Sequence, residues 1–311
     1  MLFSVSYPIV SHPPDPEFLT GAGLALFCRT AERAGFDGIG FTDHPAPTDR
    51  WLKAGGHDAL DPFAAFAYCA AVTERMRLIP NILVLPYRNP FLVAKAAATL
   101  DALSGGRFIL AVATGYLRGE YKTLGVDFDE RNDLFDEALE VIRGVWTTDD
   151  FAYTGRHFDA PGQSANPKPL PVPPIWIGGN SRLSRRRVAA VGDGWSPFAA
   201  PRVLATTAKT PPLETTADLV VMLDELWQYV DEAGRERASI DVAYSPPGAA
   251  ADLDAQARLD SIAELATVGV TWTGLSVPGD SFAHALEALE DLGSTLIAPF
   301  RGASTSGLET V

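Results

Sequence analysis

Short apolar segments, rich in β-branched residues, alternate along the chain with longer segments of helical periodicity. Several short segments are apolar at every position, as in parallel strands that are buried on both faces. The segments that predict strands are Phe3–Val10, Gly38–Thr42, Leu78–Leu85, Arg107–Ala113, Pro174–Ile177, Asp193–Ser196, Ile240–Tyr244 and Val270–Val277. Strands and helices in this order, with eight strands, predict an α/β fold in which a parallel sheet closes into a (β/α)8 barrel.

The intervening segments carry helix-end signals. The helix predicted over Leu19–Ala34 precedes Gly35, which suits a left-handed cap. The helices predicted over Phe63–Ala71 and Phe91–Leu103 each follow an Asx-Pro pair, in which the Asp or Asn caps free N–H groups and proline fits the first helical position. Further helices are predicted over Arg131–Trp146, Ala255–Thr267 and Ser281–Leu292.

An open, doubly wound sheet is the rival arrangement. It usually carries a glycine fingerprint after its first strand, and this chain contains no GxGxxG. We therefore expect one domain over residues 1–311, a TIM-like (β/α)8 barrel. It should carry a Gly- and Pro-rich insertion at about 151–173 and a long loop at about 197–213.

The charge balance limits the possible partners. The formal net charge is −14, from 39 acidic and 25 basic residues, so a nucleic-acid backbone would be repelled. The two cysteines, Cys28 and Cys69, form no CxxC pair, which suits a reducing compartment. The first residues lack the basic segment of a signal peptide, and no apolar run is long enough for a membrane span. These features predict a soluble, cytoplasmic protein that binds small molecules.

In a barrel of this kind the active site lies at the carboxyl ends of the strands, so the residues that follow each strand are the candidates. Asp43 and His44 follow the second strand, and an imidazole with a pKa of about 6.5 can exchange protons near neutral pH. The alternative is a pair that only anchors its loop. Asn81 is the one polar residue of the third strand, where its amide either bonds neighbouring backbone or stands beside a bound ring.

The fourth strand runs into Thr114, Gly115 and Tyr116. Glycine permits close approach of the backbone to a ligand, and the tyrosine could flank a ring, although such glycines also serve ordinary turns.

The fifth strand leads into a helix that carries four arginines in six residues. Gly178, Gly179 and Asn180 lie at this junction, where exposed N–H groups suit a phosphate. The alternative is an ordinary capped helix with a solvated basic face. Trp195 and Phe198 follow the sixth strand and are candidates for the substrate pocket, with core packing as the alternative for Trp195.

Together these motifs resemble the luciferase-like monooxygenase superfamily. The resemblance is carried by Thr42–Pro47, Leu85–Pro90, Leu103–Arg107, Gly115–Glu140, Pro174–Gly179 and Gly192–Trp195. It covers nearly the whole chain and is strongest before about residue 198. In detail it is closest to the branch that uses coenzyme F420, an 8-hydroxy-5-deazaflavin, rather than FMN.

The resemblance implies hydride transfer at the coenzyme, with His44 as the acid/base and Asp43 as its ring-contacting neighbour. It also implies that the Asn81–Ile82 peptide bond is cis and lies behind the ring, and that Gly178, Gly179 and Asn180 bind the coenzyme phosphate. A homodimer is a further expectation from the family.

The substrate expectation depends on Tyr116. Relatives that act on sugar phosphates carry a glutamate at the position of Tyr116, so an apolar or aromatic substrate is favoured here.

Three alternatives remain beside an F420-dependent oxidoreductase. One is an FMN-dependent monooxygenase that is supplied by a partner reductase, and another is a barrel that binds a flavin without catalysis. A metal-dependent hydrolase is disfavoured because the five histidines are scattered, with no HxH pair, so no metal site is expected.

Overall fold

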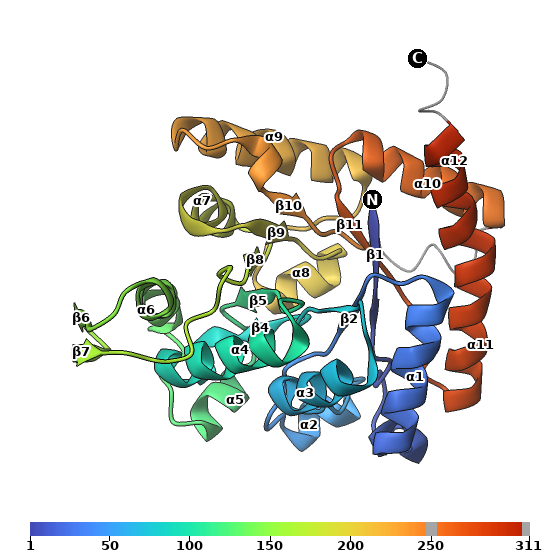
Figure 1. Cartoon of the computed structure of the whole chain (residues 1–311). Helices are drawn as coiled ribbons and strands as arrows, with labels where there is room; N and C mark the ends of the chain where they lie inside the picture. The colour runs from blue at the N-terminus through green and yellow to red at the C-terminus, as the bar shows by residue number, and fades with distance from the viewer. Residues whose placement is uncertain (247–253, 307–311) are drawn as a thin grey trace.

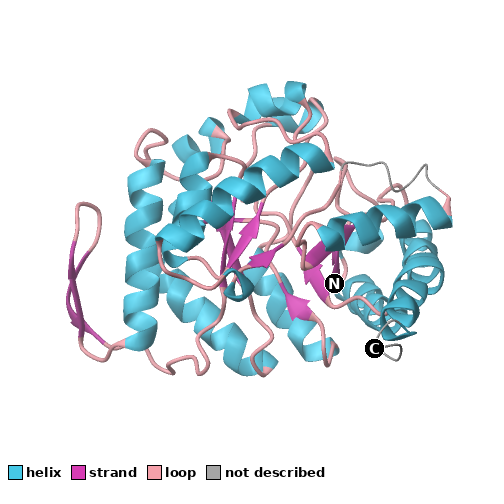
Figure 2. Ribbon diagram, turned by 90° about the horizontal axis from the view of Figure 1, so that it is seen from above, coloured by secondary structure: helices cyan, strands magenta, loops and turns pink. Residues whose placement is uncertain are grey.

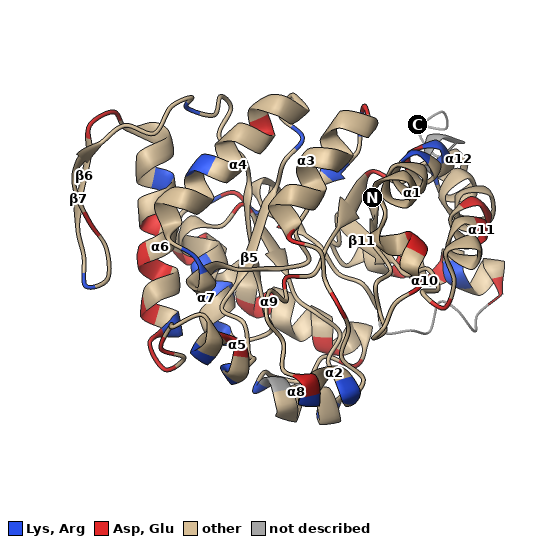
Figure 3. Ribbon diagram, turned by 90° about the horizontal axis from the view of Figure 1, so that it is seen from below, with Lys and Arg blue, Asp and Glu red and all other residues tan. Residues whose placement is uncertain are grey.

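The computed structural model describes residues 1–246 and 254–306. Strands gather at the centre, helices surround them, and a hairpin stands to one side (Figures 1 and 2). The charged residues belong mainly to the surrounding helices and loops (Figure 3). This arrangement matches the expected barrel, in which the strands are buried on both faces.

The central strands form two parallel sheets, with the orders β11-β1-β2-β3 and β10-β9-β8-β5-β4. Their bounds are β1 Leu2–Ser6, β2 Gly38–Gly40, β3 Arg77–Leu78, β4 Leu83–Val84, β5 Leu110–Ala113, β8 Ile175–Gly178, β9 Gly194–Ser196, β10 Asp241–Val242 and β11 Trp272–Leu275. A separate antiparallel hairpin consists of β6 Phe151–Thr154 and β7 Asp159–Gln163.

Two isolated parallel bridges join these sheets into a closed barrel. Leu78 pairs with Phe108 at one seam, and Ala243 pairs with Trp272 at the other. The third predicted strand is interrupted between β3 and β4, at the cis Asn81–Ile82 peptide bond. When β3 and β4 are taken as two halves of one strand, eight parallel strands surround the axis, and the predicted (β/α)8 fold is confirmed.

The helices lie outside the strands. Their bounds are α1 Gly21–Ala34, α2 Asp49–Lys53, α3 Pro62–Val72, α4 Pro90–Ser104, α5 Arg118–Thr123, α6 Arg131–Thr147, α7 Arg182–Val191, α8 Arg202–Ala208, α9 Thr216–Glu232, α10 Ala255–Thr267, α11 Phe282–Leu292 and α12 Ala298–Ser306, with short 3-10 helices η1 Pro16–Leu19, η2 Leu85–Tyr87 and η3 Arg237–Ser239 and a π-helix η4 Gly293–Ile297. None of the helices in the described residues is long and apolar enough to cross a membrane.

The predicted helix ends are confirmed by their caps. Gly35 ends α1 with φ 96°, a left-handed conformation that glycine adopts without a steric penalty. The Asp61 side chain accepts a hydrogen bond from the Ala64 N–H at the start of α3, and Asn89 accepts one from the Phe91 N–H at the start of α4.

Two segments differ from the sequence prediction. The long loop expected at 197–213 contains α8, and the helix α9 that follows was not predicted. Helix α9 begins with a capping box between Thr215 and Asp218 and buries Leu219, Met222 and Leu226 on one face. The predicted insertion at 151–173 contains the β6–β7 hairpin, and Gly144 on α6 leaves room for the Phe151 ring, which lies 2.1 Å from where a Cβ would stand.

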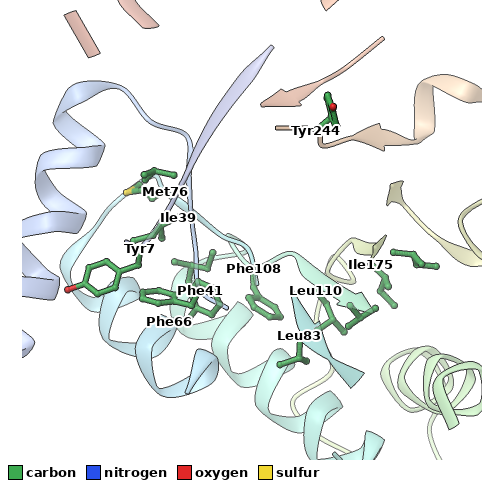
Figure 4. Close-up of a cluster of buried hydrophobic side chains, with 14 of the residues drawn as sticks. Tyr7, Ile39, Phe41, Phe66, Met76, Leu83, Phe108, Leu110, Ile175 and Tyr244 are labelled. Carbon is green, nitrogen blue, oxygen red and sulfur yellow. The ribbon is translucent and has the colours of Figure 1, made fainter. Parts of the chain in front are cut away.

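Alternate residues of the strands point outward into a continuous core between the barrel and the helices (Figure 4). Ile39, Leu110 and Ile175 are fully buried there, together with Phe66 of α3. Each such side chain contributes about 1.5–3 kcal/mol when it is fully buried. The two cysteines meet in the same core, where their free Sγ atoms lie 3.3 Å apart.

Inside the barrel lies a second, smaller core. Ile79, Ile109, Ala111, Trp176 and Trp272 form a separate buried cluster. The rings of the two tryptophans meet edge to face, with centroids 5.5 Å apart. These side chains close the barrel from within, so any ligand must enter above them.

Candidate active site

A cavity of about 190 Å³ opens at the carboxyl ends of the strands, above the two tryptophans of the inner core. The residues that line it include Ser4, Ser6, Gly40, Asn81, Trp176, Ser196, Phe198, Ala243, Ser245, Trp272, Gly274 and Ser276. Most of these inward positions carry serine, glycine or alanine where ordinary barrels carry bulky branched residues. The cavity therefore exists because the upper layer of the barrel is built from small side chains.

His44 lies on the segment after β2 and is held by a buried carboxylate. Its Nδ1 atom is 3.2 Å from Oε2 of Glu120 on α5. The histidine side chain is 12% exposed and that of Glu120 only 1%. A carboxylate at Nδ1 accepts the proton of that nitrogen, which leaves Nε2 as the nitrogen available for chemistry.

Glu120 joins three segments of the site. Its Oε2 also accepts a hydrogen bond from the Tyr87 hydroxyl at 3.0 Å, and its Oε1 accepts one from the Ala46 N–H at 3.2 Å. Burial and the nearby Glu120 raise the pKa of Tyr87 well above its usual range, so this hydroxyl remains a donor. The role of Glu120 was not predictable from the sequence, because only the fold brings α5 beside the segment after β2.

Aromatic rings cover the other side of His44. The Trp51 ring of α2 lies 4.7 Å from the imidazole, centroid to centroid, and the His57 ring lies at 5.1 Å. Burial lowers the pKa of His57, which favours its neutral form. In the part of the chain that the structure describes, no three His, Cys, Asp or Glu residues lie close enough to hold a metal ion.

Asp43 forms a buried ion pair with Arg88. Its two carboxylate oxygens accept a bidentate pair of hydrogen bonds from Arg88, at 2.6 and 2.8 Å, and Oδ2 also accepts one from the Val84 N–H. The side chain is buried, and in the described residues it forms no hydrogen bond with His44. Arg88 and β4 thus engage both oxygens of Asp43, and the ring contact that the resemblance implies for this residue stays a prediction.

The Asn81–Ile82 peptide bond is cis, as the resemblance implied. Asn81 lines the cavity and donates a hydrogen bond from Nδ2 to the Ser6 Oγ at 2.8 Å. Ile82 points toward β8, where a Cβ on Gly178 would stand 2.4 Å from its Cδ1 atom. Gly178 therefore makes room for the Ile82 side chain, whereas the resemblance had suggested that it makes room for a phosphate.

The residues after β5 lie at the rim of the barrel. Gly115 has φ 65°, and a Cβ there would stand 2.5 Å from the Val84 side chain, so this position requires glycine. The Thr114 carbonyl accepts a hydrogen bond from the Tyr121 hydroxyl. Tyr116 is 38% exposed and is not among the described residues that line the cavity.

The junction between β8 and α7 offers free backbone donors. Gly179 has φ 107°, and Ser181 rather than Asn180 caps the helix. Among the described residues, the N–H groups of positions 180–183 have no hydrogen-bond partner. A row of unpaired N–H groups at a helix start is suited to an anion.

The side chains around this junction are already engaged. Asn180 is fully buried and clamps the α8 segment, through hydrogen bonds to both main-chain groups of Phe198 and to the Pro211 carbonyl. Arg185 pairs with Glu225, and Arg187 pairs with Asp136. The side chains of Asn180, Arg185 and Arg187 are therefore held by other parts of the protein, and the phosphate site at Gly178, Gly179 and Asn180 stays a prediction.

Of the three aromatic residues proposed for the substrate pocket, Tyr116, Trp195 and Phe198, one lines the cavity. Phe198 does so and is 38% exposed. Trp195 is fully buried in the outer core, and its Nε1 donates to the Gly179 carbonyl at 3.0 Å. Its position on β9 points it outward, away from the cavity, so Trp195 belongs to the packing alternative.

The model of the luciferase-like monooxygenase family matches residues 20–295. The chain belongs to this family. Its members include oxidoreductases that use F420 and monooxygenases that use FMN.

Three relatives illustrate this range. An uncharacterized protein of Mycobacterium tuberculosis is 35% identical over 54% of the chain and 62% of its own length. An FMNH2-dependent dimethylsulfone monooxygenase of Pseudomonas fluorescens is 33% identical over 53% of the chain and 44% of its own length. An F420-dependent glucose-6-phosphate dehydrogenase of Microbacterium testaceum is 29% identical over 72% of the chain and 64% of its own length. The chain thus spans about half to two thirds of each relative.

Solved structures show the same fold. The monooxygenase RslO1 from Streptomyces bottropensis superposes with a TM-score of 0.76 at 18% identity, covering 96% of this chain and 100% of that one. An F420-dependent secondary alcohol dehydrogenase superposes with a TM-score of 0.73 at 16% identity, covering 96% and 98%. At such identities the likeness concerns the barrel alone.

The ion pair between Asp43 and Arg88 leads to a stability prediction. Arg88→Leu leaves the buried carboxylate without its partner and should lower the free energy of unfolding by about 3–5 kcal/mol in urea denaturation. Arg50→Leu, on the exposed surface of α2, serves as the matched control and should change it by less than about 0.5 kcal/mol. The double variant Arg88→Leu with Asp43→Leu should regain part of the loss, and no recovery would argue that the pair is not the source of the stability.

Proposed function

We propose that the protein is an oxidoreductase that transfers a hydride between coenzyme F420 and a small organic substrate. The observation that carries the proposal is the buried Glu120–His44 pair at the carboxyl end of the barrel, which leaves Nε2 of His44 free among the described residues. Such a pair is suited to moving one proton at the substrate. The relative named as F420-dependent aligns over more of the chain than the one named as FMNH2-dependent, which supports the same choice.

The residues present fit a coenzyme of this kind. The small inward side chains leave space above Trp176 and Trp272, and Ile79, Pro80 and Asn81 line one side of that space. The unpaired N–H groups at positions 180–183 would hold the phosphate. The ring and the phosphate of the coenzyme would thus contact separate parts of the carboxyl end of the barrel.

When bound, the coenzyme supplies the ring carbon that accepts or gives the hydride. The protein supplies the proton transfer. Glu120 keeps the proton of the neutral imidazole on Nδ1, so Nε2 can take a proton from a substrate hydroxyl. The carboxylate remains beside Nδ1 and holds the ring in place, and in the reverse direction Nε2 returns the proton to the substrate oxygen.

An FMN-dependent monooxygenase is the second candidate. It is favoured by the 33% identity to a relative with that name, which extends over 53% of the chain. This function would need a partner reductase to supply reduced FMN, and the barrel would then exclude water around the oxygenated substrate.

The coenzyme assignment can be tested by equilibrium binding. Coenzyme F420 should bind the purified protein at least about tenfold more tightly than FMN, measured for both by fluorescence quenching under the same conditions. Equal or reversed affinities would move the assignment to the monooxygenase.

The role of His44 can be tested by substitution. His44→Ala should lower the single-turnover rate about 10²–10⁴-fold with coenzyme saturating, because the proton acceptor is lost. The coenzyme affinity should change by less than about threefold. His284→Ala on the exposed surface of α11 is the matched control and should react as wild type. A folded His44→Ala protein that keeps the wild-type rate would exclude this histidine as the acid/base.

Glu120 acts through His44, as a positioning residue. Glu120→Gln should reduce the single-turnover rate by about tenfold or more, since an amide cannot favour the protonated imidazole. In a His44→Ala background the same substitution should have no further effect. An equal loss in both backgrounds would indicate that Glu120 only stabilises the fold, which urea denaturation of the four proteins would measure in parallel.

A further inference from the structure

The two cysteines of the chain are distant in the sequence and adjacent in the fold. Cys28 lies in the middle of α1 and Cys69 in the second half of α3, and these two helices pack against each other (Figure 1). The two Sγ atoms lie 3.3 Å apart, with the Cys28 thiol donating to Cys69. The chain contains no CxxC pair, so only the tertiary structure brings the two thiols into contact.

The surroundings of the pair are apolar. Both cysteine side chains are fully buried in the outer core. Burial and the two nearby cysteines raise the pKa of Tyr7 well above its usual range, so this hydroxyl stays neutral and donates to the Phe18 carbonyl at 2.9 Å. The hydrogen bond from Cys28 and burial likewise raise the pKa of the Cys69 thiol. At 3.3 Å no other atom fits between the two sulfurs, which are therefore in the position of a reduced disulfide.

Only a short movement separates this contact from a bond. The sulfurs of a disulfide are about 2.05 Å apart, so the two Sγ atoms would have to approach by about 1.3 Å. Rotation about the Cα–Cβ bonds of Cys28 and Cys69 moves each sulfur by such an amount. Helices α1 and α3 can therefore keep their packing when the bond forms.

A bond between these sulfurs would close a loop around the segment that carries the candidate acid/base. The two cysteines are 41 residues apart. The chain between them forms β2, the segment with His44, and helix α2 with Trp51, and it also contains His57 beside His44. A cross-link stabilises a protein mainly by restricting the unfolded forms of the loop that it closes. The bond would thus oppose local opening of this part of the barrel.

We propose that Cys28 and Cys69 are a site of reversible oxidation, at which hydrogen peroxide joins α1 to α3 through a disulfide. One thiolate sulfur attacks a peroxide oxygen, the O–O bond breaks, and a sulfenic acid and hydroxide result. The second thiolate attacks the sulfenic sulfur, the S–S bond forms, and the S–O bond breaks with loss of hydroxide. The two thiol protons neutralise the two hydroxide ions, so two thiols and one peroxide give one disulfide and two water molecules.

The burial of the pair sets the rate of this reaction. Peroxide reaches the sulfurs only during a transient separation of α1 from α3, so the oxidation is slow. The same burial shields the disulfide from reductants once it has formed. The proposal does not depend on the coenzyme that the barrel binds.

The first measurement identifies the bond. Folded protein is incubated with hydrogen peroxide, denatured and treated with iodoacetamide, and its peptides are analysed by mass spectrometry. The peptides with Cys28 and Cys69 should be joined, carry no iodoacetamide, weigh about 2 Da less than the two thiol peptides together, and separate on addition of dithiothreitol. The same treatment in urea shows that the reagent oxidises accessible thiols. Two alkylated cysteines in the folded protein, a sulfinic acid at either one, or a disulfide between two chains would overturn the proposal.

Cys28→Ala and Cys69→Ala are the matched controls. Each keeps one buried thiol and all three methionines, so peroxide can affect it in every way except by closing the bridge. In both variants the remaining thiol should stay free and be alkylated after denaturation. Loss of this thiol as fast as in the wild type would mean that each sulfur reacts alone, against the proposal. If neither variant folds, the peptide map of the wild type still decides.

The second measurement tests the effect of the bridge. Oxidised wild-type protein should unfold about 3–6 °C above the reduced protein in thermal scans at one rate, and peroxide should give Cys28→Ala no such rise. Hydrogen exchange in residues 41–61 should slow by about threefold or more on oxidation, while that of α9, outside the loop, should stay the same. A cross-linked protein with an unchanged midpoint and unchanged exchange would overturn the role assigned to the bridge. Neither measurement needs a coenzyme or a substrate, so its failure and the failure of the proposed function are distinguishable.

Discussion

A closed parallel barrel has to fill its own interior, and the way this chain does so determines its site. In the lower part, Trp176, Trp272 and Ile109 occupy the inward positions and leave no passage through the barrel. At the carboxyl end the same positions carry serine, glycine and alanine. The barrel is therefore closed at its lower end and open at its carboxyl end. The depth of the cavity is set by the level at which the inward side chains change from large to small.

Two buried carboxylates hold the segments at the carboxyl end of the barrel in place. Asp43 ties the segment after β2 to β4 and Arg88, and Glu120 ties that segment to η2 and α5. Both are nearly inaccessible to water, so each must keep its partners to avoid the cost of an unpaired buried charge. The contacts of Asp43 hold the backbone of this segment, whereas the contacts of Glu120 hold the imidazole of His44. The two neighbours Asp43 and His44 consequently serve different purposes.

The family includes relatives named as F420-dependent and as FMNH2-dependent. In this chain the carboxyl end of the barrel combines a cavity above an apolar floor with a row of N–H groups, at the start of α7, that are unpaired among the described residues. Under the proposed function these two features would hold a flat ring and a phosphate, and side chains at the rim, among them His44 and the rings beside it, would distinguish one coenzyme chemistry from the other.

The sequence by itself determined the barrel, the helix caps and the region of the site. Apolar runs of strand length and Asx-Pro pairs act locally, so their consequences can be derived without the fold. The cis bond at Asn81 followed from resemblance to a family, and the proposed role of His44 rests on the same resemblance together with its position after the second strand. The partners of Asp43, Gly178 and Asn180 were not predictable from position alone.

Tertiary structure decided those roles because each depends on a partner distant along the chain. Arg88 lies 45 residues from Asp43, and Glu120 lies 76 residues from His44. The direction of Trp195 depended on strand register, which turns alternate residues to opposite faces and sent this ring into the outer core. The fold likewise decided which serine side chains line one cavity. Only closure of the barrel brings the ends of β1, β9, β10 and β11 around one axis.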